Sequence, residues 1–340
     1  MPNQRAIAKA AGVTQATVSM ALRNDPSIST ETKERIREIA HQLQYRPNSY
    51  ISSLMTHIRS GRPPQDKGCI ALVVDAESEK NLHSQLETYK CQYNGMVRRA
   101  EELGFHTECF FLKASGMTPK RLNQILNARG ITGLILTPPR RPGTDVLQME
   151  WEHFATATIA YEWPAPAIDR VTTHHRHNVQ FAFQNLAARG YRKIGMSIPP
   201  DATNGVDSSW KAGFLLWQDK QSPKQRVPLF IGKPGITPIA IFQEWLKKWA
   251  LDAIICLIGH EKEWLDELGL RTPDDIGMVC VNRPLNSTFS GIEENHEEIG
   301  AAVVDLVAAQ ITRNEYGLPR HPKLILIEGT WVQGETIRLE

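Results

Sequence analysis

From residue 69 onward, short apolar runs alternate with longer stretches of helical periodicity. The apolar runs span 69–74, 107–112, 133–136 and 156–160, and helical patterns span 89–103 and 118–128. This order is typical of parallel strands joined by helices that cover both faces of a sheet. The alternation therefore predicts an α/β fold for most of the chain.

The same rhythm restarts further along the chain. Expected strands cover 193–198, 253–257, 277–281 and 323–327, and expected helices cover 178–189, 209–218, 239–249, 262–268 and 297–313. Two such series in 340 residues exceed what one hydrophobic core holds. We expect two doubly wound parallel-sheet lobes, with residues 65–164 and 293–321 in the first and residues 165–292 and 322–340 in the second.

Residues 4–44 show helical periodicity only, which predicts a separate three-helix unit. Apolar side chains share one face of each expected helix: Ile7, Ala8 and Ala11, then Val18, Ala21 and Leu22, then Ile36, Ile39, Ala40 and Leu43. Asn3, Thr14 and Ser29 can cap the helix starts, because their side-chain oxygens accept from free backbone N–H groups. Gly12 marks a short turn between the first two helices, as in a helix-turn-helix.

The positive charge of the chain is concentrated in its first 62 residues. They hold nine Lys or Arg against four Asp or Glu, a net of +5, whereas the whole chain carries +2. The remaining residues therefore carry −3. A basic head on a mildly acidic body is expected when only the head binds a polyanion such as DNA.

A further amphipathic stretch follows the three-helix unit. Its apolar positions are Ile51, Leu54, Met55 and Ile58, and a linker of sequence SGRPP follows at residues 60–64. Such a linker composition marks a domain boundary. We expect a DNA-binding head over residues 1–46 and a hinge helix with its linker over residues 47–64.

The second helix of the head begins with small polar side chains. They can reach base edges in a major groove, while Thr14 and the helix N-terminus face phosphate. The segment 6–19, AIAKAAGVTQATVS, closely resembles the head of the lac-repressor (LacI/GalR) family, and the resemblance continues without a gap to residue 48. It implies a sequence-specific transcriptional regulator whose two lobes look like a type I periplasmic binding protein.

The resemblance implies which head residues contact DNA. Base contacts fall on Gln15, Ala16 and Met20, and the wider DNA-binding set is Thr14, Thr17, Ser19, Arg23, Ser29, Tyr45 and Asn48. Met20 stands where many relatives have Arg, and Ala16 has no hydrogen-bonding group, so the operator should differ from better-known ones. An ordinary exposed polar residue is the alternative for Gln15.

In the hinge, the resemblance maps a minor-groove wedge onto Leu54. Two copies from a symmetric dimer would insert side by side at the centre of a palindromic site and bend the duplex. The alternative is that Ile51, Leu54, Met55 and Ile58 only pack against a partner helix.

Two doubly wound lobes on one chain bind a small polar ligand between them, at the carboxyl ends of the strands. Expected effector contacts are Asp75, Tyr161, Trp163, Asp207, Trp210, His260 and Asn282. Their aromatic planes and bidentate groups suit a sugar or a related metabolite. The alternative for Tyr161 and Trp210 is that both are half-buried packing residues.

This cleft departs from the family pattern at several positions. Trp210 stands where most relatives have Arg, Asn282 stands where many have Asp, and His177-Asn178 replaces the Asp-Asn or Asp-Gly that usually opens a helix. Two charged ligand clamps are thereby lost. No known effector can be transferred to this chain on resemblance alone.

Several classes of site are not expected. The run 174–177, HHRH, places its histidines in different directions at a helix start without a second ligand cluster, so we expect no metal. The sequence holds no nucleotide-binding, nucleophile-elbow or zincin motif, so we expect neither a cofactor nor catalysis. The five cysteines lack C-x-x-C spacing and indicate a reducing compartment. With no apolar leader or membrane-spanning stretch, the expected location is the cytoplasm, without a membrane partner.

Together these features predict an allosteric transcriptional regulator, a repressor or an activator, with a repressor favoured. A homodimer would bind a pseudo-palindromic double-stranded operator, and ligand closure of the lobes would change hinge geometry and operator affinity. A dimer is expected over a tetramer, because no leucine heptads trail Trp331-Val332 and a palindromic site requires two-fold symmetry. Two alternatives stay open: a DNA-binding regulator whose cleft senses nothing, and a sugar-modifying enzyme with a DNA-binding head.

Overall fold

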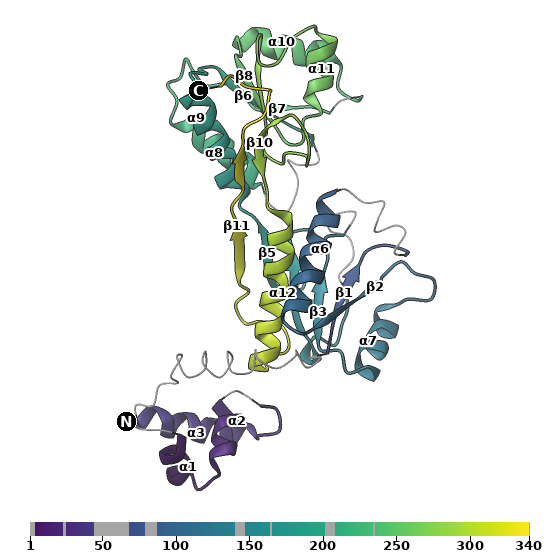
Figure 1. The fold of residues 1–340 in the computed structure, drawn as a ribbon, viewed down its shortest axis with the longest axis vertical. Coiled ribbons are helices and arrows are strands. Elements are labelled where there is room, and N and C mark those ends of the chain that lie inside the picture. The colour runs from purple at the N-terminus through teal and green to yellow at the C-terminus, as the bar shows by residue number, and fades with distance from the viewer. Residues whose placement is uncertain are drawn as a thin grey trace.

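The chain forms a small helical head and two α/β lobes (Figure 1). The computed structural model describes residues 4–22, 25–43, 68–78, 87–139, 147–163, 165–200, 208–233 and 235–339. The expected hinge, residues 47–64, therefore lies outside the described residues, as do Arg23, Tyr45, Asn48 and Asp207. Within the described part, no helix is long and apolar enough to cross a bilayer.

The head consists of α1 (Gln4–Ala11), α2 (Gln15–Leu22) and α3 (Thr30–Gln42). Ile7, Val18 and Ile36 are fully buried at the centre of its small core, which confirms the expected apolar faces at these positions. Leu43 was expected on the buried face of the third helix, but it is 36% exposed. It follows the last residue of α3, so the helical spacing that would turn it inward ends before it.

The first lobe is built on a six-stranded sheet in which all paired strands are parallel. The strand order is β11-β5-β4-β3-β1-β2. The strands are β1 (Cys69–Val74), β2 (His106–Phe111), β3 (Gly133–Leu136), β4 (Ala155–Ile159), β5 (Asp169–Thr173) and β11 (Leu324–Ile327). The helices of this lobe are α6 (Glu87–Glu102), α7 (Pro119–Ala128) and α12 (His296–Arg313), with a short 3-10 turn η1 (Trp151–His153).

The second lobe repeats the architecture with the order β12-β10-β9-β8-β6-β7. Its strands are β6 (Ile194–Ile198), β7 (Phe230–Ile231), β8 (Ala253–Cys256), β9 (Gly277–Cys280), β10 (Ser290–Glu293) and β12 (Thr330–Val332). Its helices are α8 (His175–Ala188), α9 (Ser209–Asp219), α10 (Ile239–Trp249) and α11 (Glu261–Glu267).

One edge of the second sheet corrects the expectation of wholly parallel lobes. β12 pairs with β10 in the antiparallel direction, with Ile292 opposite Trp331. Only residues 328–329 separate β11 from β12. Because β11 pairs with β5 in the first sheet, this short link carries the chain directly from one sheet to the other.

The sheets also divide the chain differently from the expected lobe boundaries. Boundaries at residues 164 and 321 would assign β5 and β11 to the second lobe, whereas both strands pair in the first sheet. Asp169 helps to fix this arrangement, because its buried carboxylate accepts from the Lys323 backbone N–H at 2.8 Å. We therefore propose that the first lobe extends to residue 173 and takes in residues 294–327.

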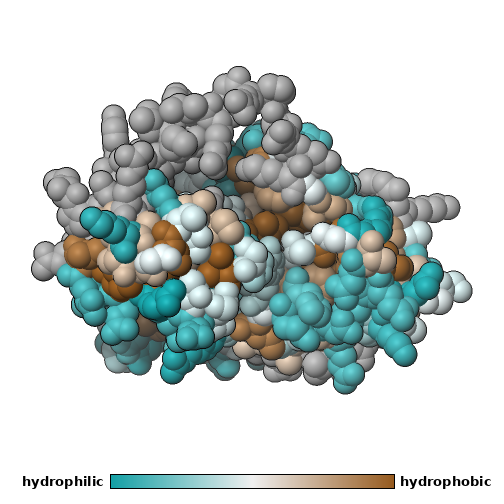
Figure 2. Space-filling view, turned by 90° about the horizontal axis from the view of Figure 1, so that it is seen from below, coloured by the Kyte–Doolittle hydropathy of each residue, from teal (hydrophilic) through white to brown (hydrophobic). Residues whose placement is uncertain are grey.

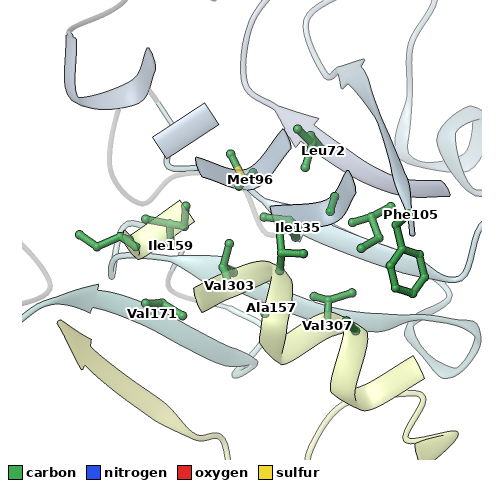
Figure 3. Close-up of a cluster of buried hydrophobic side chains, with 14 of the residues drawn as sticks. Leu72, Met96, Phe105, Ile135, Ala157, Ile159, Val171, Val303 and Val307 are labelled. Atoms are coloured by element: carbon green, nitrogen blue, oxygen red, sulfur yellow. The ribbon is translucent and has the colours of Figure 1, made fainter. Parts of the chain in front are cut away.

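The first lobe is held together where α6 and α12 pack side by side against the sheet (Figure 3). Leu72, Met96, Ile135, Val303 and Val307 are all at most 2% exposed in this cluster. The two helices approach closely because each has a glycine at the contact. A methyl group on Gly95 would meet the Glu297 carbonyl, and one on Gly300 would meet the Gln92 carbonyl.

On the face seen from below, hydrophobic patches lie among hydrophilic side chains (Figure 2). All five cysteines are free thiols. Cys256 and Cys280 lie opposite each other on β8 and β9, buried, with their sulfurs 3.6 Å apart.

The lobes are joined by connections that lie close together: β5 to α8, β10 to α12, and β11 to β12 (Figure 1). We call residues 174–175, 294–296 and 328–329 the crossover segments. The His174 N–H donates to the Ile327 carbonyl at 2.8 Å, and Asn295 Nδ2 donates to the Glu328 carbonyl at 2.9 Å. These bonds tie the crossover segments into one junction between the lobes.

Candidate DNA-reading helix and interlobe cleft

The start of α2 is capped and faces outward. Thr14 Oγ1 accepts from the Thr17 backbone N–H at 3.1 Å, and Ser29 caps α3 in the same way through the Thr32 N–H. Both caps confirm the sequence-based expectation; the third expected cap, Asn3, lies outside the described residues. Gly12 ends α1 with a φ of +66°, a left-handed conformation that glycine adopts readily, and so allows the sharp turn into α2.

Two of the three proposed base-reading residues, Gln15 and Ala16, lie on the exposed side of this helix start. Thr14, Gln15 and Ala16 are exposed, whereas Val18 and Ala21 on the other side of α2 are buried in the head core. Thr17, Ser19 and Met20 are partly buried, and Ser29 is exposed at the start of α3. A helix that presents its N-terminus and first polar side chains while its back is packed can enter a major groove.

Between the lobes the structure has a cavity of about 220 Å³. Its walls come from α6, the ends of β4 and β5, the start of α9 and the crossover segments. The polar or aromatic lining residues are Thr88, Tyr89, Gln92, Glu162, Thr172, Thr173, His175, Trp210, Asn282, Glu294 and His296. The cavity thus lies at the carboxyl ends of parallel strands, where α/β folds bind ligands.

A hydrogen-bonded cluster forms one wall of the cavity. The Glu294 side chain is 2% exposed, and its Oε1 lies 3.3 Å from His175 Nδ1. His296 Nε2 lies 3.3 Å from Asn282 Oδ1 and 3.8 Å from Glu294 Oε2. Burial lowers the pKa of His296, which favours its neutral form. Glu294 therefore sits between two imidazoles, one from each of two crossover segments.

Glu162, which follows β4, also lines the cavity. Burial is the main reason that the pKa of this carboxyl is raised. Its Oε2 is buried and has no hydrogen-bond partner, and the same is true of Trp210 Nε1 and His296 Nδ1. Trp210 contacts the His175 ring, with the ring centroids 4.4 Å apart. Unpaired buried polar atoms that line one cavity are what a polar ligand would satisfy.

The expected effector residues fall into two groups. Trp210 and Asn282 line the cavity together. Asp75, Tyr161 and His260 are not among the residues that line it. The Asp75 carboxylate lies 3.4 Å from the Lys113 ammonium, and the Tyr161 ring lies beneath the Arg170 guanidinium. His260 is exposed immediately before α11. Trp163 is 5% exposed and donates its indole N–H to the Thr137 carbonyl, so it packs in the core of the first lobe.

Sequence reasoning missed His175, Glu294 and His296 as cavity residues. The histidine run was weighed only as a metal site, and within the described residues no three His, Cys, Asp or Glu side chains are grouped to hold a metal ion. Glu294 and His296 follow β10, a strand that the apolar pattern did not reveal. The available signal was polar residues immediately before the last long helix.

Two family models match this chain. Residues 5–48 match the model described as bacterial regulatory proteins, lacI family, and residues 183–337 match a periplasmic binding protein-like domain. The first match covers the head, and the second covers most of the second lobe together with α12 and β11.

Curated relatives agree with these matches. The chain is 24% identical over 328 residues to the HTH-type transcriptional regulator PtxS of Pseudomonas plecoglossicida, which covers 90% of this chain and 88% of the relative. Over 48 residues, 14% of each chain, it is 52% identical to the probable HTH-type transcriptional repressor ExuR of Bacillus subtilis (strain 168).

Solved structures show the same fold. The complex of the transcriptional regulator CelR with cellobiose aligns with a TM-score of 0.57 at 19% identity, covering 99% of this chain and all of that one. The lac repressor dimer bound to operator aligns with a TM-score of 0.53 at 17% identity and 98% coverage of both chains. The chain thus joins a head that matches the lacI family of bacterial regulatory proteins to a periplasmic binding protein-like core, and together with the curated relatives these matches support a LacI/GalR family regulator.

Proposed function

We propose that this chain is a cytoplasmic repressor that binds a pseudo-palindromic operator as a homodimer. A small polar ligand held between the lobes controls its affinity for that operator. One observation carries the proposal. His175, Glu294 and His296 of two crossover segments line the interlobe cavity, so a ligand bound there would contact connections that join the lobes.

The DNA contacts in this proposal come from the start of α2. Gln15, Ala16 and Met20 read base edges, and Thr14, Thr17, Ser19 and Ser29 contact phosphates. The exposure of Thr14, Gln15 and Ala16 supports the assignment. For Arg23, Tyr45, Asn48 and the Leu54 wedge, the family resemblance alone supports the role.

The ligand in this proposal is a sugar or a related polyol. The CelR structure is a cellobiose complex, and a CcpA structure from Weissella paramesenteroides contains glucose. Because the curated relatives are named as regulators, we assign the cavity to binding and not to turnover. Sugar binding that favours one arrangement of the lobes would shift the equilibrium of the whole regulator.

An operator titration tests the proposal. The full-length protein is titrated onto a duplex selected from random sequence, with and without each member of a library of neutral sugars, amino sugars and sugar acids. We expect one sugar to change operator affinity about 5- to 150-fold. His296→Ala should abolish that change while the ligand-free affinity stays, whereas the exposed His321→Ala should keep it. Equal affinity for selected and scrambled duplexes, or no response to any sugar, would refute the proposal.

A further inference from the structure

The described walls of the interlobe cavity carry two carboxylates, Glu162 and Glu294, and no Lys or Arg. Two imidazoles also line the cavity. Burial lowers the pKa of His296, which favours its neutral form, and His175 Nδ1 lies 3.3 Å from Glu294 Oε1. The described lining therefore carries acidic side chains and no permanent cation.

Two described cations close to the lining residues, Arg170 and Arg283, are engaged in other contacts. The Arg170 guanidinium lies 5.1 Å from the Tyr161 ring centroid and its Nη1 is 3.4 Å from the Ala160 carbonyl. Arg283 donates to the carbonyls of Phe289 and Ser287. Each guanidinium would have to give up these contacts to neutralise an anion in the cavity.

The acceptors of the cavity, in contrast, are available to a ligand. Glu162 Oε2 is buried without a hydrogen-bond partner. Glu294 Oε2 lies 3.8 Å from His296, beyond hydrogen-bond distance. Both oxygens can accept from a ligand, and an ionised carboxylate can only accept. A ligand carboxylate or phosphate at either place would bring like charges together in a site of low dielectric.

We infer that the effector presents hydroxyl or ammonium donors to Glu162 and Glu294 and carries no carboxylate or phosphate group. The inference rests on the proposed function and narrows its ligand class: acidic sugars and sugar phosphates are excluded, and neutral or amine-bearing polyols are accepted. The departures at Trp210 and Asn282 fit this class, because they add a ring face and an amide without adding charge.

Matched ligand sets test the inference on the full-length protein. Each set is a neutral sugar, its amino sugar and its uronic acid, for example glucose, glucosamine and glucuronate, with galactose and mannose as further sets. Binding is measured by titration calorimetry at pH 8, where the carboxyls and the sugar acid are ionised. We expect each acid to bind at least about tenfold more weakly than its neutral parent, a difference of about 1.4 kcal/mol.

The arms of the experiment distinguish the possible donors. Tightest binding of a neutral sugar identifies hydroxyl donors, and tightest binding of an amino sugar identifies an ammonium donor. A uronic acid that binds more tightly than its parent overturns the inference while leaving ligand sensing intact. If no sugar in any set binds although the operator is still bound, the proposed sensing fails, and the inference fails with it.

Charge-removing variants assign the effect to the cavity. Glu162→Gln and Glu294→Gln should each reduce the preference for the neutral sugar over its acid by about threefold or more. Glu298→Gln is the matched control, since it removes the same charge from an exposed position four residues after Glu294. If Glu298→Gln reduces the preference for the neutral sugar over its acid as much as Glu162→Gln and Glu294→Gln do, the selectivity comes from the overall charge of the protein. The assignment of the selectivity to Glu162 and Glu294 would then be wrong.

Discussion

Asp169 is the buried carboxylate that fixes the unexpected strand β5 in place. It is 1% exposed, its Oδ1 accepts from the Lys323 N–H at 2.8 Å, and its Oδ2 accepts from Gln310 Nε2 at 3.1 Å. It therefore links β5 to the segment entering β11 and to α12. Asp169→Ala would leave two donors without their partner inside the first lobe.

The size of the effect follows from these two bonds. A hydrogen bond to a charged group contributes about 1.5–3 kcal/mol, so the variant should lose about 3–6 kcal/mol of unfolding free energy. The nearby Lys323 ammonium adds little, because it lies 3.7 Å away on a side chain that is 56% exposed. A loss of this size should lower the melting temperature by on the order of 10 °C.

Urea unfolding followed by fluorescence and circular dichroism measures the loss. Asp169→Asn should lose less than Asp169→Ala, because its amide oxygen can still accept from the Lys323 N–H. Asp219→Ala is the surface control, since that side chain is 86% exposed. If Asp169→Ala costs less than about 1 kcal/mol, or no more than the control, the buried bonds do not hold β5 as argued.

Three further outcomes are expected. Burial raises the pKa of Glu261 above its ordinary value of about 4.5. The unfolding free energy of the protein should therefore fall as pH rises from about 4.5 through the raised pKa. Glu261→Gln can still accept from Ser197 and should remove this pH dependence, as measured by unfolding at a series of pH values. Gly300→Val would press a side chain against the Gln92 carbonyl and should cost about 1–3 kcal/mol or more in the same assay. Gln15→Ala should weaken binding to the selected operator by about 1–3 kcal/mol and leave the salt dependence of binding to random DNA unchanged, as measured by fluorescence anisotropy.

Most helices and strands could be predicted because their residues are uniformly apolar or strictly periodic. The sequence-based bounds of β1, β3 and α10 agree with those of the structure, and those of most other elements differ by one to three residues. Continuous apolar runs such as LIL in β3 are typical of strands buried on both faces.

The missed strands are polar or very short. β5 begins with Asp169 and Arg170 and β10 reads SGIE, whereas β7 (FI) and β12 (TWV) are only two and three residues long. Their polar side chains find partners that only the tertiary structure supplies. Ser290, for example, is fully buried because its Oγ accepts from the Gly334 N–H at 3.0 Å. A pattern of apolar residues cannot reveal such strands.

The position of the cavity was predicted from the sequence, but only some of its lining residues were. Trp210 and Asn282 were expected from the rule that ligands bind beyond the carboxyl ends of strands. His175, Glu294 and His296 could not be expected, because they meet only when connections more than 100 residues apart in sequence become neighbours, as the His175–Glu294 pair does with its separation of 119. The expected DNA-reading residues were easier to assign from the sequence, because the head is formed by residues that are close together along the chain.

The helix that leaves the cavity also acts as a lever arm. α12 begins at His296 in the cavity wall and continues for 18 residues to Arg313, a length of about 27 Å at the usual helical rise. A tilt of about 5° at the ligand end would displace the far end by about 2 Å. Its close glycine contacts with α6 join the two helices, so a tilt beside a bound ligand would be carried to the opposite end of the first lobe.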